Sequence, residues 1–297
     1  MKGAVFRMIR LVDEERGVVA WINLEQGNRV ASLSFQGDNV LRDPGMPFLA
    51  PWANRMPGGF HADGRYSPLN LALGNLELDA AGIPIHGLLS NSRWWEVVRS
   101  GSSFVTSRLE FWRHRELMAQ WPFAHQYEMT YRLDAGVLEV NVEMQNLAAV
   151  RMPVAIGFHP YFTLPGVPRD HCRVRVPAGL RIVHDERVLA TGELLPAELP
   201  ELVSLAGNCL DSGYTGLEED ACFRIEGGGK AVAIQLDRHW PVVILWGPEG
   251  KDFLCVEPMA APTDGINLHH RGLWPGLQWI APGAAWRGSF RIAGHGF

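Results

Sequence analysis

Alternation of apolar and polar side chains over residues 127–145 constrains the fold of this chain more than any other feature. Two alternating runs flank the turn Asp134-Ala135-Gly136. A period of two on both sides of a glycine-containing turn predicts an antiparallel hairpin with one buried face. The apolar positions of that face are Tyr127, Met129, Tyr131 and Leu133 before the turn, and Leu138, Val140, Val142 and Met144 after it.

The same pattern recurs elsewhere in the chain. Residues 104–112 alternate in this way, and near the C-terminus Trp286, Phe290 and Ile292 alternate with polar residues behind the turn Pro282-Gly283. No helical period is sustained, and 32 glycines and 20 prolines separate short apolar runs. We therefore predict an all-β chain that forms a large antiparallel β-sandwich. Because no linker or low-complexity tract divides the sequence, we expect residues 1–297 to form one domain.

Composition excludes several classes of partner. The net charge is −5, and no run of five like charges occurs, which argues against nucleic acid and anionic membrane surfaces. The first 17 residues are rich in charge, and the longest apolar stretch, residues 241–246, is far too short to span a membrane. Scattered single cysteines favour reduced thiols and a cytoplasmic location. These cysteines are Cys172, Cys209, Cys222 and Cys255.

The hexapeptide Gly157-Phe158-His159-Pro160-Tyr161-Phe162 is the first candidate for chemistry. It places a titratable imidazole among aromatic rings and next to a proline that restricts the backbone. Such a segment suits a group that donates or accepts one proton beside a flat, polar ligand. The alternative is a satisfied, half-buried histidine without any catalytic role.

Four other segments set polar groups at the edges of expected strands. They contain Asn54-Arg55, His86-Gly87, Asp211-Ser212-Gly213 and Glu257-Pro258. Glu257 follows the apolar run 253–256, so we expect a strand that ends there because a proline cannot continue the ladder. Each has a plainer alternative: Glu257 as an exposed edge glutamate, His86 as a loop histidine bonded to backbone, Arg55 in a salt bridge, and Asp211 as a turn-forming residue.

Taken in this order, the segments resemble the aldose 1-epimerase (galactose mutarotase) family from about residue 20 onward. The closing Ile280-Ala281-Pro282-Gly283 is also similar to that family. The resemblance implies a β-supersandwich that binds a hexose and needs no cofactor or metal. It assigns His159 as the acid and Glu257 as the base. The substrate-binding residues that it implies are Asn54, Arg55, His86 and Asp211.

The implied reaction interconverts the α and β anomers of a hexose. A base removes the proton of the anomeric hydroxyl while an acid protonates the ring oxygen, and the opened chain rotates before it closes on the other face. We expect Glu257 and His159 to lie on opposite sides of the ring. Trp52, Tyr161 and Phe162 either offer the sugar an apolar face or belong to the core.

Two residues depart from the best-known members of that family. Phe158 precedes His159 and Thr163 follows Phe162, where those members have asparagines, so the chain is placed in a divergent branch. Another such branch acts on hexose 6-phosphates and needs arginines around the phosphate. Arg55, Arg65 and Arg93 are the candidates for that role.

Two further functions stay open at this point. One is a non-catalytic carbohydrate-binding protein, which has no need of Glu257 and His159 together. The other is a metal enzyme with His86, His159 and Glu257 as a facial triad. The sequence lacks the His-x-His pair usual in such β-barrels, and His269-His270 read as loop residues. The expected partner is a small sugar, and the expected assembly is a monomer or homodimer.

Overall fold

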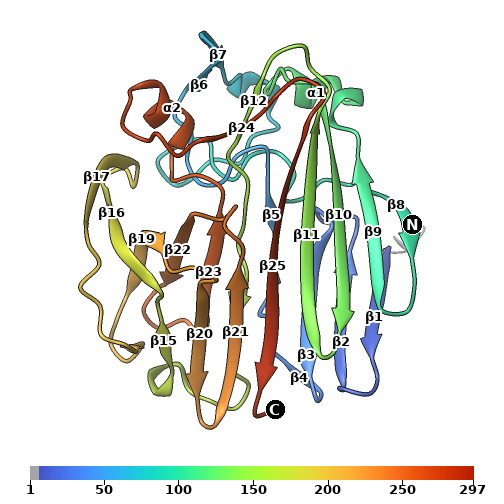
Figure 1. The fold of residues 1–297 in the computed structure, drawn as a ribbon, viewed down its shortest axis with the longest axis vertical. Coiled ribbons are helices and arrows are strands. Elements are labelled where there is room, and N and C mark those ends of the chain that lie inside the picture. Colours follow the sequence, from blue (N-terminus) through green and yellow to red (C-terminus); the bar gives the residue numbers. More distant parts are fainter. Residues whose placement is uncertain (1–6) are drawn as a thin grey trace.

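Two large antiparallel sheets form the body of the protein in the computed structural model, which describes residues 7–297. Figure 1 looks onto the nine-stranded sheet, whose long strands run side by side. Its order is β18 (Val203–Ser204), β15 (Arg173–Arg175), β20 (Cys222–Gly227), β21 (Lys230–Leu236), β25 (Ala285–His295), β11 (Val137–Asn146), β10 (His125–Asp134), β9 (Phe104–Leu109) and β8 (Glu96–Ser100). The predicted all-β sandwich is confirmed.

The second sheet has eight strands and carries the candidate catalytic residues. Its order is β17 (Ala190–Pro196), β16 (Ala178–His184), β19 (Leu210–Leu217), β22 (Val242–Gly247), β23 (Leu254–Met259), β13 (Gly157–Phe158) and β5 (Phe48–Leu49), and β14 (Tyr161–Phe162) also pairs with β23. A four-stranded sheet joins β1 (Met8–Asp13), β2 (Val18–Asn23), β3 (Arg29–Phe35) and β4 (Asp38–Asn39).

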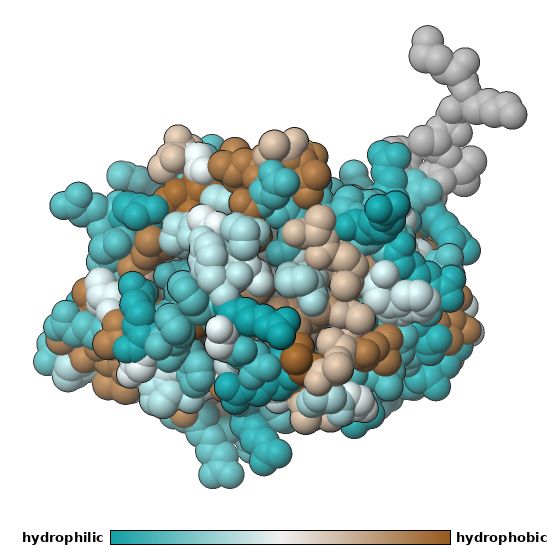
Figure 2. Space-filling model, turned by 90° about the horizontal axis from the view of Figure 1, so that it is seen from above, coloured by the Kyte–Doolittle hydropathy of each residue, from teal (hydrophilic) through white to brown (hydrophobic). Residues whose placement is uncertain are grey.

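Short elements gather at one end of the sandwich, at the top of Figure 1. They are the pairs β6 (Gly59–Ala62) with β7 (Arg65–Pro68) and β12 (Met152–Val154) with β24 (Gln278–Ile280), and the helices α1 (Arg115–Met118) and α2 (Gly265–His270). Three 3-10 turns span Leu71–Leu73, Phe111–Arg113 and Arg169–His171. Seen from above, hydrophobic residues lie in several separate groups among hydrophilic ones (Figure 2).

The hairpin expected over residues 127–145 is formed by β10 and β11, with Tyr127 opposite Met144. All eight apolar positions named above are buried. The turn is one residue shorter than expected, because Asp134 pairs with Val137 and only Ala135 and Gly136 connect the strands. Both have positive φ (48° and 81°), as in the two-residue turns whose twist matches a hairpin.

Two local expectations were wrong. The strand expected over 104–112 ends at Leu109, and Phe111–Arg113 turns into a 3-10 helix with Phe111 buried. His269 and His270 lie in α2 rather than in a loop. Both segments are too short for periodicity to separate helix from irregular chain. Within residues 7–297, no helix has the length and apolar character needed to span a bilayer.

Phe158 joins the two sheets at the site. Its ring lies 4.9 Å from that of Phe290 in β25, 5.1 Å from Phe48 in β5 and 5.8 Å from Trp240. The side chain is fully buried. The position where the sequence leaves the family pattern is therefore an aromatic contact of the core, and this contact fixes the backbone of the adjacent His159.

Register places His159 opposite Glu257. Gly157 pairs with Met259 and Tyr161 pairs with Cys255, so the same antiparallel register sets residue 159 against residue 257. The two flanking pairs thus hold the histidine and the glutamate as neighbours on adjacent segments of the sheet.

Glu257 lies inside β23 and not at its end, which corrects the expectation from Pro258. The strand continues to Met259, and Pro258 pairs with Val243 of β22. The N–H of Ala260 donates to the carbonyl of Ile156. Because every second backbone nitrogen of a strand points to the same side, the nitrogen of Pro258 also points toward the segment 157–162. The pairing between β23 and this segment is interrupted around His159, so Pro258 removes no hydrogen bond of the ladder.

The close approach of β13 to β23 predicts the effect of enlarging Gly157. A Cβ at this position would lie 2.1 Å from Met259 Sδ and 3.0 Å from both Ala53 Cβ and the Pro258 carbonyl oxygen. We expect Gly157→Ala to lower the free energy of unfolding by about 1–3 kcal/mol through overpacking. Gly179→Ala is the control, because the nearest atom to its added Cβ is 3.5 Å away. Equal denaturant midpoints for the two variants would contradict this account.

Candidate active site

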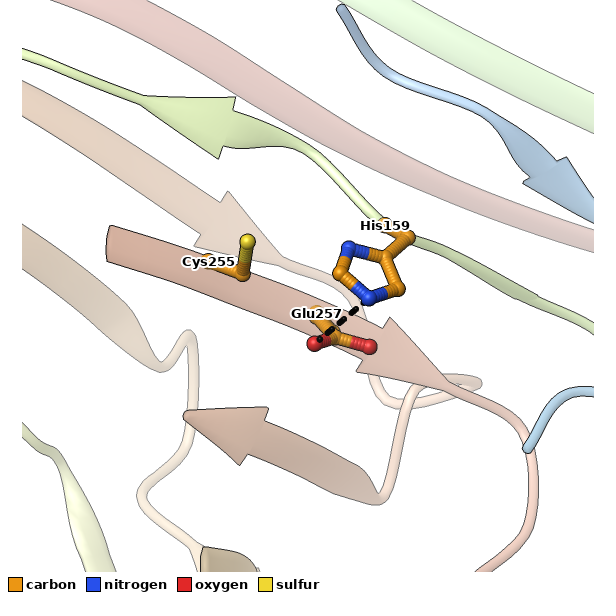
Figure 3. Close-up of side chains that lie close together, drawn as sticks. All are labelled: His159, Cys255 and Glu257. Atoms are coloured by element: carbon orange, nitrogen blue, oxygen red, sulfur yellow. Dashed lines mark ion pairs between the residues drawn. The ribbon is translucent and has the colours of Figure 1, made fainter. Parts of the chain in front are cut away.

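A histidine and a glutamate meet in the interior of the protein. His159 Nε2 lies 3.4 Å from Glu257 Oε1, and their side chains are 11% and 2% exposed. Figure 3 shows the imidazole pointing from the chain after β13 toward the carboxylate on β23. Glu257 is therefore no exposed edge residue. The pair lies instead in a nearly dry environment, where one side of His159 still reaches the surface.

Burial shifts the pKa values of His159 and Glu257 in opposite directions. Desolvation, assisted by the neighbouring His86, lowers the pKa of His159 to about 3. Desolvation, assisted by the negative charge of Asp211, raises the pKa of Glu257 well above its usual value. Both shifts disfavour separate charges. Acid–base groups whose pKa values are moved in this way are typical of catalytic sites.

His86 and Asn54 come from two loops that hold each other. The His86 N–H donates to the Asn54 carbonyl at 3.0 Å, and both residues have positive φ (61° and 56°). Gly87 has φ 70°, and a Cβ there would lie 2.3 Å from the Ala50 carbonyl oxygen. Residues held in this sparsely populated backbone region cluster at functional sites. The His86 ring stands edge-on to that of His159 with centroids 5.4 Å apart.

Four buried polar atoms of the site have no hydrogen-bond partner among the described residues. They are Asn54 Nδ2, His86 Nδ1, His159 Nδ1 and Glu257 Oε2. Leaving one such atom unsatisfied costs about 1–3 kcal/mol, so a concentration of them is unfavourable for folding. A ligand with several hydroxyl groups would satisfy donors and acceptors together. No protein group within residues 7–297 satisfies His159 Nδ1, which differs from the plainer alternative of a core histidine bonded within the protein.

Arg55 makes the ion pair of its plainer alternative, and its charge also reaches His86 of the site. Its Nε donates to Asp79 Oδ2 at 2.6 Å, while its two terminal amino groups meet no acceptor within residues 7–297. The positive charge of Arg55 contributes to lowering the pKa of His86, after burial. Asp79 is itself fixed by the N–H groups of Ile83 and Ala81, which together with Arg55 hold its pKa low.

Asp211 lies in β19, and not in a turn as its plainer alternative required. It is exposed and pairs with Trp246 of β22, which pairs with Cys255 of β23. Paired residues project from the same face of a sheet, so Asp211 shares the face of Glu257. Its charge acts on Glu257 and on His184, although no hydrogen bond joins it to either.

The aromatic residues divide between core and site. Trp52 and Phe162 are 1% exposed and belong to the core. Tyr161 is half-buried and stacks on His159 with ring centroids 4.7 Å apart and planes at 13°. Trp246 stands edge-on to His159 at 5.6 Å, and Phe253 packs on Tyr161 at 5.1 Å. Trp246 and Phe253 were not predicted, because they sit within ordinary apolar runs.

Sequence reasoning also missed His184 at the end of β16. A Cβ on Gly213 would lie 3.0 Å from His184 Cε1, which places this ring beside the central strands of the same sheet. No local motif marks it. Of the other arginines proposed for a phosphate, Arg65 begins β7, and Arg93 lines a hollow with Glu77 and Gly87.

Three potential metal ligands lie together, but they differ from the triad considered above. Ligand atoms of His159, Cys255 and Glu257 fall within 4.8 Å of one another, and all three residues are buried. This is the one such group within residues 7–297, and His86 is not part of it. Figure 3 shows Cys255 and Glu257 on the same face of β23.

Comparisons with known proteins show which sequences and folds this chain resembles. The chain is 27% identical over 248 residues to the uncharacterized protein YphB of Escherichia coli K12, and 25% identical over 257 residues to YihR of the same organism. These alignments cover 79% and 81% of this chain, and 78% and 80% of the relatives. A galactose mutarotase-like protein of Clostridium acetobutylicum superimposes with a TM-score of 0.84 at 19% identity, over 98% of this chain and 99% of that one. The aldose 1-epimerase profile matches residues 9–293, and the chain belongs to that family.

Proposed function

We propose that this protein interconverts the α and β anomers of a hexose. The observation that carries the proposal is the 3.4 Å contact between His159 Nε2 and Glu257 Oε1, an acid–base pair in a buried site with unpartnered polar atoms. A protein that only binds sugar has no need of two proton-transferring groups in contact. Family membership supports the same reaction class.

We propose that the pair faces one edge of the sugar, in place of the two opposite sides of the ring expected above. Groups 3.4 Å apart cannot hold a pyranose between them. The anomeric hydroxyl and the ring oxygen are both bonded to the anomeric carbon, so an adjacent base and acid reach both. Glu257 takes the hydroxyl proton while His159 protonates the ring oxygen, and the carbon–carbon bond next to the aldehyde rotates in the open chain. The reverse transfers close the ring on the other face.

The opposed pKa shifts suit this exchange. Because burial raises the pKa of Glu257 and lowers that of His159, we expect the resting pair to be a carboxylic acid beside a neutral imidazole. Moving one proton across the contact gives a carboxylate and an imidazolium, which are the required base and acid. Sugar hydroxyls that bond Glu257 Oε2 would stabilise the charged form. Substrate binding would thus bring the pair into the charged form that transfers protons.

A neutral hexose suits the charges around the pair better than a phosphorylated one. Arg55 is the arginine whose charge reaches His86, and Asp79 already offsets it. Asp211 adds a negative charge near Glu257. We propose that Arg55, His86, Asn54 and Asp211 bind hydroxyl groups. Rates with glucose, galactose and glucose 6-phosphate measured side by side test this, and a clear preference for the phosphate would favour the alternative substrate.

Removing either member of the pair should stop catalysis. We expect Glu257→Gln and His159→Asn each to slow mutarotation of freshly dissolved α-glucose or α-galactose by about 10²–10⁴-fold, because each loses one proton transfer. Polarimetry follows the rate. Glu249→Gln and His171→Asn are matched controls at exposed positions and should leave it unchanged. Wild-type protein that does not accelerate the reaction of either sugar, or a pair variant with an undiminished rate, would refute the proposal.

The buried carboxyl group should also lower stability. Glu257→Gln keeps the shape of the side chain and removes the cost of burying an ionisable group, so we expect it to be about 1–2 kcal/mol more stable than wild type. Glu139→Gln, a partly exposed partner of Arg291, should change little. Thermal melts at pH 7.5 make the comparison. A Glu257→Gln variant less stable than wild type would mean that the surrounding protein favours the charged carboxylate.

Asp79 should act by positioning Arg55. Asp79→Asn keeps an oxygen for the Ile83 and Ala81 N–H groups but weakens the ion pair. We expect KM to rise about tenfold and kcat to change little, since a charge-assisted contact with the sugar is weakened. Asp63→Asn breaks a similar Arg–Asp contact on the surface, with Arg151 Nε at 3.0 Å, and should affect neither constant. An effect on kcat alone would assign Asp79 a different role.

A further inference from the structure

Cys255 adds a third metal-binding group to the proposed catalytic pair. It lies two residues before Glu257 in β23, so both side chains rise from one face of the sheet. His159 lies opposite Glu257 in the register. The three ligand atoms lie within 4.8 Å of one another, and their residues are buried. The reaction proposed above does not use the thiol, and no hydrogen bond within residues 7–297 involves it.

The donor set selects for a particular kind of cation. Thiolate and imidazole are ligands that Zn²⁺ prefers, and a carboxylate completes a set of three with a fourth position open. Bond lengths of about 2.0–2.3 Å in a tetrahedral site separate ligand atoms by about 3.4–3.6 Å. His159 Nε2 and Glu257 Oε1 already have this spacing, at 3.4 Å. The thiol sulfur lies within 4.8 Å of both atoms, so it needs to approach them by at most about 1 Å.

Charge also fits a divalent cation. Binding replaces the thiol proton of Cys255 and the carboxyl proton of Glu257, and both protons leave to solvent. The thiolate and the carboxylate then balance the two positive charges. A neutral cluster is acceptable in a buried site, whereas an isolated charge is not. No thiol–disulfide or redox step is involved.

The second ring nitrogen of His159 has no hydrogen-bond partner within residues 7–297, and this limits the affinity of the site for a metal. A metal-bound histidine usually donates its second ring N–H to a carboxylate or carbonyl, and loss of that partner lowers metal affinity about 10–100-fold. His159 Nδ1 is buried and has no partner within residues 7–297. This favours a reversible ligand over a permanently held cofactor.

We propose that His159, Cys255 and Glu257 form a binding site for Zn²⁺ or a similar cation, and that this cation competes with the sugar. The atoms that bind the metal are those that would transfer protons, so metal and substrate exclude each other. The competition rests on the proposed function, whereas the metal site itself does not.

Cobalt provides a direct test of the ligands. Chelator-treated protein titrated with Co²⁺ should bind one equivalent and develop a sulfur-to-cobalt charge-transfer band with the intense visible bands of tetrahedral Co²⁺. Cys255→Ser should abolish the charge-transfer band and weaken Zn²⁺ binding, measured by competition with a zinc indicator, at least about tenfold. Cys209→Ser is the control, because this exposed cysteine is the alternative source of a thiolate signal. A band that persists in Cys255→Ser and disappears in Cys209→Ser would overturn the proposal.

Inhibition of the sugar reaction by Zn²⁺ provides a second test of the proposal. If the chain is a mutarotase, Zn²⁺ should raise the apparent KM for the sugar and a chelator should restore it, while Cys255→Ser should need at least about tenfold more Zn²⁺ for the same fractional inhibition of its own rate. Co²⁺ binding through Cys255 in a protein without mutarotase activity would refute the proposed function alone. Mutarotase activity without Co²⁺ or Zn²⁺ binding at Cys255 would refute the metal site alone.

Discussion

The site depends on the antiparallel pairing of β23 with both ends of the segment 157–162. Gly157 opposite Met259 and Tyr161 opposite Cys255 leave His159 facing Glu257. Phe158 points the other way, into the aromatic contact between the two sheets. One short segment therefore uses alternate residues for the core and for chemistry. The packing that stabilises the sandwich also fixes the imidazole, because neighbouring residues of one chain cannot move independently.

Burial determines the acid–base properties of the His159–Glu257 pair. Separate charges are unfavourable in this environment, and the shifts in both pKa values have burial as their main cause. The same environment leaves donors and acceptors of Asn54, His86, His159 and Glu257 without partners. The surrounding fold holds these groups in an arrangement that is unfavourable by itself, and the proposed sugar would supply the missing interactions. Cys255 places a thiol beside the same pair, and the proposed competition between sugar and cation rests on this position.

Several of the site residues could be named from the sequence because their order along the chain resembles that of a family. Local patterns alone did not distinguish Glu257 from an edge glutamate, or His159 from a core histidine. Trp246, Phe253 and His184 escaped because nothing in their neighbourhoods differs from an ordinary strand. They reach the site only through the order β16, β19, β22 and β23, which is a property of the sheet.

The sequence by itself determined the all-β class and the β10–β11 hairpin with its buried face, because side-chain alternation is local. The order of the family motifs along the chain named the candidate acid and base. Only the tertiary structure decided that Glu257 lies within β23, that Trp52 and Phe162 belong to the core, and that Cys255 joins His159. The contact of Cys255 and Glu257 with His159 arises from pairing between segments almost a hundred residues apart. Register, burial and distance between such segments are set when the sheets pack, since a single strand records which residues alternate but not which neighbour they face.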